Sequence, residues 1–177
     1  RRLARDLALK LDDYNRERQT FENRIRTDAV EMLNESFDPH RDPVIVLGSR
    51  IWHHGVVGIV ASRLMRQYHK PTFIVAIDAD GIGKGSGRSI EGVSLVEAIR
   101  ACGDDLLAGG GHAMAAGLSI EEGRIDSFRK NLAAYVLGAT TPEQRQPKLM
   151  YDAEIGFDQL SLEFLASYDL LQPFGSG

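Results

Sequence analysis

The sequence predicts an α/β fold preceded by one long helix. Two observations carry this prediction: a long N-terminal stretch has apolar residues at helical spacing, and a middle section alternates short β-rich runs with helical patterns. The chain has 177 residues, of which 43% are hydrophobic and 26% are charged, so it can bury a real core. We therefore expect one ordinary domain with an appendage.

Residues 1–38 are predicted to form the long helix, because apolar residues recur there at three- and four-residue steps or their multiples, with charged residues between them. These apolar residues are Leu3, Leu7, Leu11, Tyr14, Phe21, Ile25 and Met32. The helix is expected to end at Asp38, since the residue before Pro39 is pushed out of the helical region. A helix of this length needs a partner surface for its apolar side.

Residues 43–138 are predicted to form the α/β domain. Its first strands are expected at 44–47 and 72–77, where β-branched residues are concentrated. The apolar residues between these two runs follow helical spacing, which predicts a helix that starts near Val56.

Two more helices are expected in the second half of this domain. Ser94 and Glu97 have the spacing of a capping box, which opens the first of them. Apolar residues at helical spacing from Ile125 onward predict the second, and Gly138 is expected to close it.

The remaining residues are predicted to contain a linker and part of a second domain. Threonines and prolines in 139–148 are typical of a linker. Residues 149–177 offer a strand near 149–155 and a short helix near 161–171. About thirty residues are too few for an independent core, so we expect this second domain to be truncated.

The charge distribution argues against a strongly basic nucleic-acid-binding protein. The net charge of the whole chain is −4. Residues 149–177 hold five acidic residues and no Lys or Arg, which leaves 21 basic and 20 acidic residues in 1–148. Nucleic-acid binding would then have to come from local clustering of positive charge.

Membrane and disulfide-rich classes are excluded by simple features of the sequence. No apolar run approaches the ~20 residues that span a bilayer, and the N-terminus lacks the apolar core of a signal peptide. The single Cys102 excludes an intramolecular disulfide and a cysteine-based zinc cluster. We expect a soluble, cytoplasmic protein with no membrane partner.

A glycine-rich stretch at 80–89 is the first candidate for phosphate binding. It matches neither of the standard phosphate-loop fingerprints, and Ser86 lacks the flanking glycines of a nucleophile elbow. Around Gly87, however, Ser86, Arg88 and Ser89 supply two hydroxyls and a guanidinium, which suit phosphate oxygens. The alternative is an ordinary glycine-rich hairpin whose arginine points to solvent.

Residues 109–117 form a second glycine-rich stretch, in which His112 is the only polar side chain. Its small residues let backbone amides approach a ligand, as in an anion pocket. An imidazole beside such amides can donate a hydrogen bond to a phosphate oxygen or polarise it. The alternative is a tight turn that feeds a strand whose alanines pack against a helix.

Three other polar residues are candidates for a site: His53, His54 and Arg63. We reject a metal site at His53 and His54, because adjacent side chains point in different directions and no Asp or Glu lies within six residues of the pair. Arg63 lies on the helix expected from Val56. It is either a secondary phosphate contact or a helix-surface cation.

Three motifs together resemble the DHH-associated domain of the RecJ family of single-stranded-DNA exonucleases. They are WHHGVVGIVASRL at 52–64, GSGRS at 85–89 and GGGHAMAAG at 109–117. Residues 11–19 resemble the long connecting helix of that family, and residues 171–177 resemble the entrance to its oligonucleotide-binding-fold domain. The resemblance implies a central mixed β-sheet flanked by helices and preceded by the connecting helix.

The resemblance implies that the parent protein degrades single-stranded DNA 5′ to 3′ in recombination and repair, with Mn²⁺ or Mg²⁺ bound by a preceding DHH domain. This chain has no Asp-His-His string, so we expect the fragment to bind no metal and to lack nuclease activity. Single-stranded DNA is the expected ligand, a single-strand-binding protein or a helicase is the expected partner of the parent, and the chain is expected to be monomeric. The family usually has proline where this chain has His54.

The same resemblance implies roles for individual residues. One group would hold the terminal phosphate and fix the polarity of the strand: Ser86, Arg88 and Ser89. Another would reach the scissile phosphate: His112 with the amides of Gly110 and Gly111.

Two other functions remain open from the sequence. The histidine-glycine motif also occurs in oligoribonucleases and cyclic-dinucleotide phosphodiesterases of the same superfamily, although the long helix and the tail at 171–177 speak against them. The chain could also be a nucleic-acid-binding module without a catalytic parent. Metal-ligand motifs of Asp and His upstream of this sequence would support the nuclease.

Overall fold

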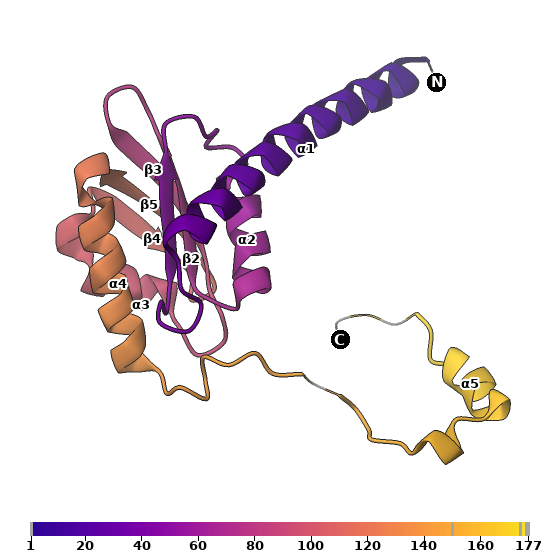
Figure 1. Cartoon of the computed structure of the whole chain (residues 1–177). Helices are drawn as coiled ribbons and strands as arrows, with labels where there is room; N and C mark the ends of the chain where they lie inside the picture. Colours follow the sequence, from indigo (N-terminus) through magenta and orange to yellow (C-terminus); the bar gives the residue numbers. More distant parts are fainter. Residues whose placement is uncertain (1, 150, 174, 176–177) are drawn as a thin grey trace. The chain divides into compact units, whose positions relative to one another are not determined.

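The computed structural model describes residues 2–149, 151–173 and 175 and confirms the α/β fold. The chain divides into two compact units, Arg1–Pro147 and Lys148–Gly177. The first unit contains a five-stranded mixed sheet between helices, with a long helix before it (Figure 1).

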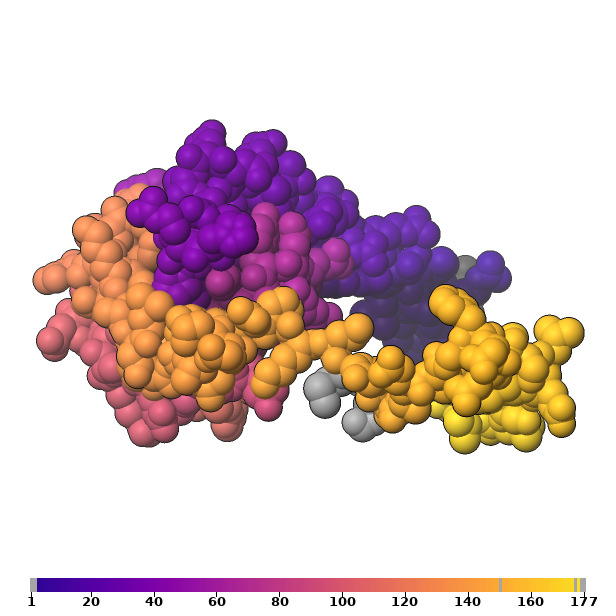
Figure 2. All heavy atoms as spheres, turned by 60° about the horizontal axis from the view of Figure 1, so that its bottom comes forward, coloured from indigo at the N-terminus to yellow at the C-terminus, as the bar shows by residue number. Residues whose placement is uncertain are grey.

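The predicted long helix is α1 (Arg2–Ser36), which ends two residues before the expected Asp38. The second half of α1 packs against α2 (Val57–Tyr68) (Figures 1 and 2). Ile25, Ala29 and Leu33 are buried there, whereas the leucines of the first half are exposed. Neither α1 nor any other helix in the described ranges is both long and apolar enough to cross a membrane.

The sheet has the strand order β1-β2-β3-β5-β4. Its strands are β1 (Ile45–Ser49), β2 (Thr72–Ile77), β3 (Ile82–Arg88), β4 (Ala108–Gly111) and β5 (Ala115–Glu121). The β1–β2 pair is parallel and the other pairs are antiparallel, so the expected mixed sheet is confirmed. Both glycine-rich stretches of the sequence belong to strands of this sheet.

Helices cover the two faces of the sheet unequally. α3 (Leu95–Ala101) and α4 (Ile125–Ala139) lie on one face, and α2 lies on the other (Figure 1). Alternate residues of β2 point to the two faces, so Phe73 packs with the α4 core and Ile74 with the α2 core. Short 3-10 helices, η1 (Gly103–Asp105) and η2 (Glu122–Arg124), follow α3 and precede α4.

Two helix-end predictions are wrong in detail. Ser94 is the N-cap of α3, but its side chain makes no capping hydrogen bond, so the capping box does not form. Gly138 lies inside α4, which continues to Ala139. Thr140 follows α4 in an extended conformation, and its buried hydroxyl donates to the Val136 carbonyl, a contact that the sequence pattern did not reveal.

In its described residues, the second unit contains one short α-helix and no core of its own. Its helix α5 (Leu162–Asp169) agrees with the expected helix near 161–171, and a 3-10 helix, η3 (Phe157–Gln159), precedes it. Every described side chain in this unit is exposed. The strand expected near 149–155 is absent from the described residues of that stretch, because a strand needs a neighbouring strand to pair with.

Candidate functional site

One part of the sheet surface is left open. α2 covers β2 and β3 on its side of the sheet, but β4 is exposed along its whole length. The period-two alternation and the strand register place the following residues on the side of β3, β5 and β4 that faces α2, which α2 covers at β3 and leaves uncovered at β5 and β4. We call this side the open face. Its residues are Lys84, Ser86, Arg88, Ala108, Gly110, Ala115, Gly117 and Ser119. This set contains two cations and no carboxylate.

A row of small residues crosses the open face. Ser86 of β3 pairs with Gly117 of β5, which pairs in turn with Gly110 of β4. A Cβ added at Gly110 would meet nothing within 4 Å, and one at Gly117 would meet only the Gly85 carbonyl oxygen at 3.8 Å. These residues help to line a shallow depression of about 470 Å³, within the size range of small-ligand sites. The two glycine-rich stretches therefore form one surface.

The neighbouring row carries the two functional side chains that the sequence singled out. Arg88 lies opposite Ala115, whose carbonyl accepts a hydrogen bond from the His112 N–H at 2.8 Å. The backbones of Arg88 and His112 are two strand spacings apart, a separation of about 10 Å. His112 is exposed, and its imidazole has no hydrogen-bond partner in the part of the chain that the structure describes.

Contacts on both sides hold the Arg88 guanidinium in place. Arg88 Nη1 donates to the Ser86 hydroxyl at 3.1 Å and to the Gly87 carbonyl at 2.7 Å. Gly58 of α2 lies above, where an added Cβ would lie 3.2 Å from Arg88 Nη2. The side chain is half-buried and fixed by one of its two terminal nitrogens, so the other donors of its planar fork remain for an anion.

The two glycines expected to offer amides differ in their geometry. The His112 N–H bond to Ala115 marks a hydrogen-bonded pair, and such pairs alternate along an antiparallel ladder. Gly111 therefore points its N–H away from β5, at the edge of the sheet, whereas the Gly110 N–H lies within the ladder. Gly111 also has φ of +146°, a conformation that favours glycine. Gly110 contributes open surface, and Gly111 contributes the available donor.

Ser89 does not lie on the open face. Its side chain is 1% exposed, and its hydroxyl donates to the Val93 carbonyl at 2.7 Å. Its N–H donates to the Met114 carbonyl at 3.0 Å. In this structure Ser89 holds the tip of the β4–β5 hairpin in place, and its expected phosphate contact stays a prediction.

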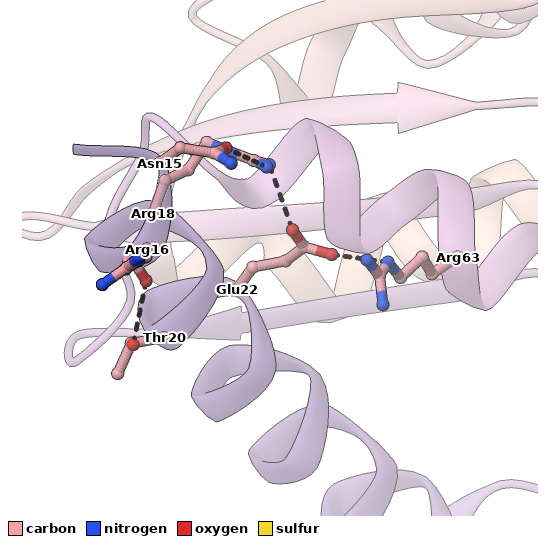
Figure 3. A network of polar contacts seen from close by, with 6 residues as sticks. All are labelled: Asn15, Arg16, Arg18, Thr20, Glu22 and Arg63. Carbon is pink, nitrogen blue, oxygen red and sulfur yellow. Dashed lines mark hydrogen bonds and ion pairs between the residues drawn. The ribbon is translucent and has the colours of Figure 1, made fainter. Parts of the chain in front are cut away.

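Arg63 is also engaged elsewhere. Its Nε lies 2.5 Å from Glu22 Oε1, and Arg18 Nη1 lies 3.1 Å from Glu22 Oε2 (Figure 3). Glu22 is 1% exposed, so the two arginines neutralise a buried carboxylate between α1 and α2. Arg63 thus contributes to the contact between α1 and α2, and its secondary phosphate contact stays a prediction.

The argument against a metal at His53 and His54 also needs correction. Their rings do not diverge but stack, with centroids 4.8 Å apart and an interplanar angle of 20°. The ring of Phe21 stacks on the other side of His53 at 5.9 Å. Across the described residues, no group of three or more His, Cys, Asp or Glu side chains could hold a metal ion.

Two members of the site were missed in the sequence. Lys84 shares the open face with Ser86 and Arg88, and the two-residue spacing of a strand could have revealed it. Gly58 allows α2 to approach Ser86, and a glycine inside a helical pattern is a recognised sign of such close packing.

Comparisons with known proteins agree with this fold. The model of the DHHA1 domain matches residues 41–138. The chain is 35% identical over 174 residues to the single-stranded-DNA-specific exonuclease RecJ of Bacillus subtilis, covering 97% of this chain and 22% of that protein. It is 40% identical over 167 residues to the RecJ of Dickeya dadantii, covering 90% of this chain and 29% of that protein.

Solved structures give the same result. The crystal structure of RecJ in complex with Mn²⁺ from Thermus thermophilus superposes with a TM-score of 0.66 and 32% identity, covering 94% of this chain and 24% of that one. A crystal structure of exonuclease RecJ bound to manganese gives 0.65 and 37%, covering 80% of this chain and 34% of that one. The chain thus spans less than a third of the length of the curated relatives from Bacillus subtilis and Dickeya dadantii. It belongs to the DHHA1 domain family.

Proposed function

We propose that this chain is the substrate-binding part of a 5′ to 3′ single-stranded-DNA exonuclease of recombination and repair. The observation that carries the proposal is the open face, where Arg88 and the uncovered Gly110–Gly117 row lie beside each other on one side of the sheet. The RecJ names of the relatives support single-stranded DNA as the substrate class.

The open face suits a sugar-phosphate backbone for three reasons. Arg88 presents a planar fork that matches phosphate oxygens, and Ser86 keeps it oriented. Lys84 adds a second positive charge on the same strand. The glycine row leaves room for a phosphate to approach the backbone closely.

His112 and Gly111 would act at a second phosphate. An exposed imidazole and an outward N–H at the edge of the sheet can both donate hydrogen bonds to phosphate oxygens. Such donors stabilise charge that develops on phosphorus when they are already in place. We propose that Arg88 binds the terminal phosphate and that His112 lies at the phosphate where hydrolysis occurs.

The chemical step itself would come from another domain. The described residues offer no metal cluster, whereas structures of RecJ relatives are described as complexes with Mn²⁺ or Mg²⁺. In the proposed enzyme, Mn²⁺ or Mg²⁺ in a DHH domain would activate water. The open face would hold the strand against that site, and the 177-residue chain alone would not hydrolyse DNA.

The proposal is tested by the preference for a terminal phosphate. Affinities of the chain and its Arg88→Ala variant are measured for hexathymidylates that carry a 5′-phosphate or a 5′-hydroxyl. A hydrogen bond to a charged group contributes about 1.5–3 kcal/mol, so Arg88→Ala should weaken binding of the phosphorylated strand about ten-fold or more. Binding of the hydroxyl strand should change little.

Arg66→Ala is the matched control, because Arg66 is an exposed cation on α2 outside the open face. It should leave the preference intact. Equal losses for both strands in Arg88→Ala, or no loss for either, would contradict the terminal-phosphate role. The affinity for a hexauridylate, measured in the same assay, shows whether the site distinguishes DNA from RNA.

A further inference from the structure

Three aromatic rings form a stack at the junction of α1 and the loop before α2. His53 lies between Phe21 and His54, with ring centroids at 5.9 and 4.8 Å and interplanar angles of 26° and 20°. His54 is exposed, and within the described ranges no further ring stacks on it. The phosphate contacts proposed above use none of these three rings.

The stack is held in place by its own backbone. The Gly55 N–H donates to His53 Nδ1 at 3.1 Å, which fixes the orientation of the ring. A Cβ at Gly55 would lie 3.0 Å from His53 Nδ1 and Cε1, so glycine is what allows this approach. The neighbouring Trp52 is 6% exposed and anchors the loop in the core beneath. A platform that is already ordered loses little entropy when a ligand binds.

Two depressions flank the stack, and one of them reaches the open face at Lys84. One lies against α1 and is lined in part by Phe21, Arg24 and His53. The other is lined in part by His53, His54 and Lys84. Lys84 also lines the depression that contains Gly110 and Gly117. A strand whose phosphates lie on the open face can therefore continue past Lys84 to the rings.

We propose that Phe21, His53 and His54 form a platform on which an unpaired base of the bound strand stacks against the outer face of His54. The proposal rests on the proposed function, because it takes the strand on the open face as its starting point. Every base has a π-face, so such stacking tolerates any sequence, as a degradative site requires. Lys84 would hold the phosphate between the platform and the open face.

The test uses single-stranded hexanucleotides with a 5′-phosphate and one 2-aminopurine, placed at each position in turn. Stacking on a ring quenches the fluorescence of 2-aminopurine, so wild-type chain should quench one position more than the others. His54→Ala should abolish that quenching and weaken binding about five-fold or more. His54→Phe should retain both, because it keeps the ring and removes the imidazole nitrogens.

Two controls separate stacking from charge and from misfolding. An oligonucleotide that is abasic at the quenched position should bind wild type and His54→Ala equally, since the phosphates are unchanged. His40→Ala removes an exposed histidine that lines neither depression, and it should behave as wild type. Circular dichroism of His54→Ala should match that of wild type.

The outcomes distinguish this inference from the proposed function. If wild type prefers the 5′-phosphate but quenches no position, the phosphate site stands and the platform is wrong. If His54→Phe loses binding as His54→Ala does, the imidazole acts through charge or hydrogen bonding and the stacking role is overturned. If wild type shows neither a phosphate preference nor quenching, both proposals fail.

Discussion

Gly58 of α2 lies directly over Ser86 of β3, so close that a Cβ at position 58 would lie 2.9 Å from the Ser86 hydroxyl. The same Cβ would lie 3.2 Å from Arg88 Nη2. The helix and the strand that we propose binds phosphate thus meet at a glycine, and the position of Arg88 depends on a residue that carries no functional group. This contact links the packing of the fold to its proposed function.

Gly58→Ala should weaken phosphate binding more than it changes stability. The methyl group pushes the Ser86 hydroxyl and the Arg88 guanidinium out of position, while alanine gains up to about 1 kcal/mol of helix propensity, which offsets the steric cost. We expect a loss of about ten-fold in affinity for a 5′-phosphorylated strand, measured by fluorescence anisotropy. Gly138→Ala in α4, where the space is open, should raise stability and leave affinity unchanged. Equal affinities for wild type and Gly58→Ala would refute the link.

Two adjacent glycines of β4 should respond in opposite ways to alanine. Gly111 has φ of +146°, and its added Cβ would lie 2.5 Å from the Ala115 carbonyl oxygen, so Gly111→Ala should destabilise the protein by about 1–3 kcal/mol. Gly110→Ala points a methyl into open space and should leave stability unchanged or slightly higher. It should still reduce DNA affinity, because the methyl occupies the glycine row. Urea unfolding measures the effect on stability, and fluorescence anisotropy measures the effect on DNA affinity. If Gly110→Ala bound DNA as tightly as wild type, the result would contradict DNA binding on the open face.

The buried carboxylate of Glu22 predicts a structural role for Arg63. Arg63→Met leaves Glu22 with Arg18 alone in a site that water does not reach, so we expect a loss of about 3 kcal/mol in the free energy of unfolding. Arg66→Met on the exposed side of the same helix should cost less than about 0.5 kcal/mol. If Arg63→Met weakened DNA binding without a loss of stability, the result would contradict this structural role and support Arg63 as a phosphate contact.

Cys102 predicts a loss of stability at alkaline pH. Burial raises the pKa of its thiol from 9.0 to about 11, and nearby Asp105 adds to the rise. Above pH 9 the unfolded chain loses the thiol proton while the folded chain keeps it, so this contribution to stability falls as pH rises toward 11. The difference in unfolding free energy between wild type and Cys102→Ala should shrink by up to about 1.4 kcal/mol per pH unit in that window. Urea denaturation from pH 8 to 11 checks this, and parallel curves would contradict it.

Much of the fold could be predicted because it depends on local patterns. The short β-rich runs at 44–47 and 72–77 became β1 and β2, and the segments with helical spacing became α1, α2 and α4. The expected strand near 149–155 failed for a different reason: a β-rich run becomes a strand only where another strand pairs with it. Helix ends were also imprecise, since contacts such as Thr140 with Val136 depend on tertiary packing.

The site was predicted in part. Residue type and the neighbouring glycines singled out Arg88 and His112, and the resemblance to RecJ implied their roles. The sheet register then places His112, directly after β4, two strand spacings from Arg88 of β3. Sequence could not show that Ser89 points inward or that Arg63 faces Glu22, because those orientations depend on long-range contacts. The stacking of His53 on His54 could not be predicted, because the rule that adjacent side chains diverge holds for regular elements and the loop before α2 is irregular.

The most direct measurement of the central claim is an NMR titration of the ¹⁵N-labelled chain with 5′-phosphorylated trithymidylate. Binding on the open face predicts saturable shifts of the backbone amides at Arg88, Gly110, Gly111 and Gly117, and weaker shifts with the 5′-hydroxyl strand. Shifts confined to residues outside β3, β4 and β5, or none at millimolar ligand, would contradict the assignment of this face to single-stranded DNA.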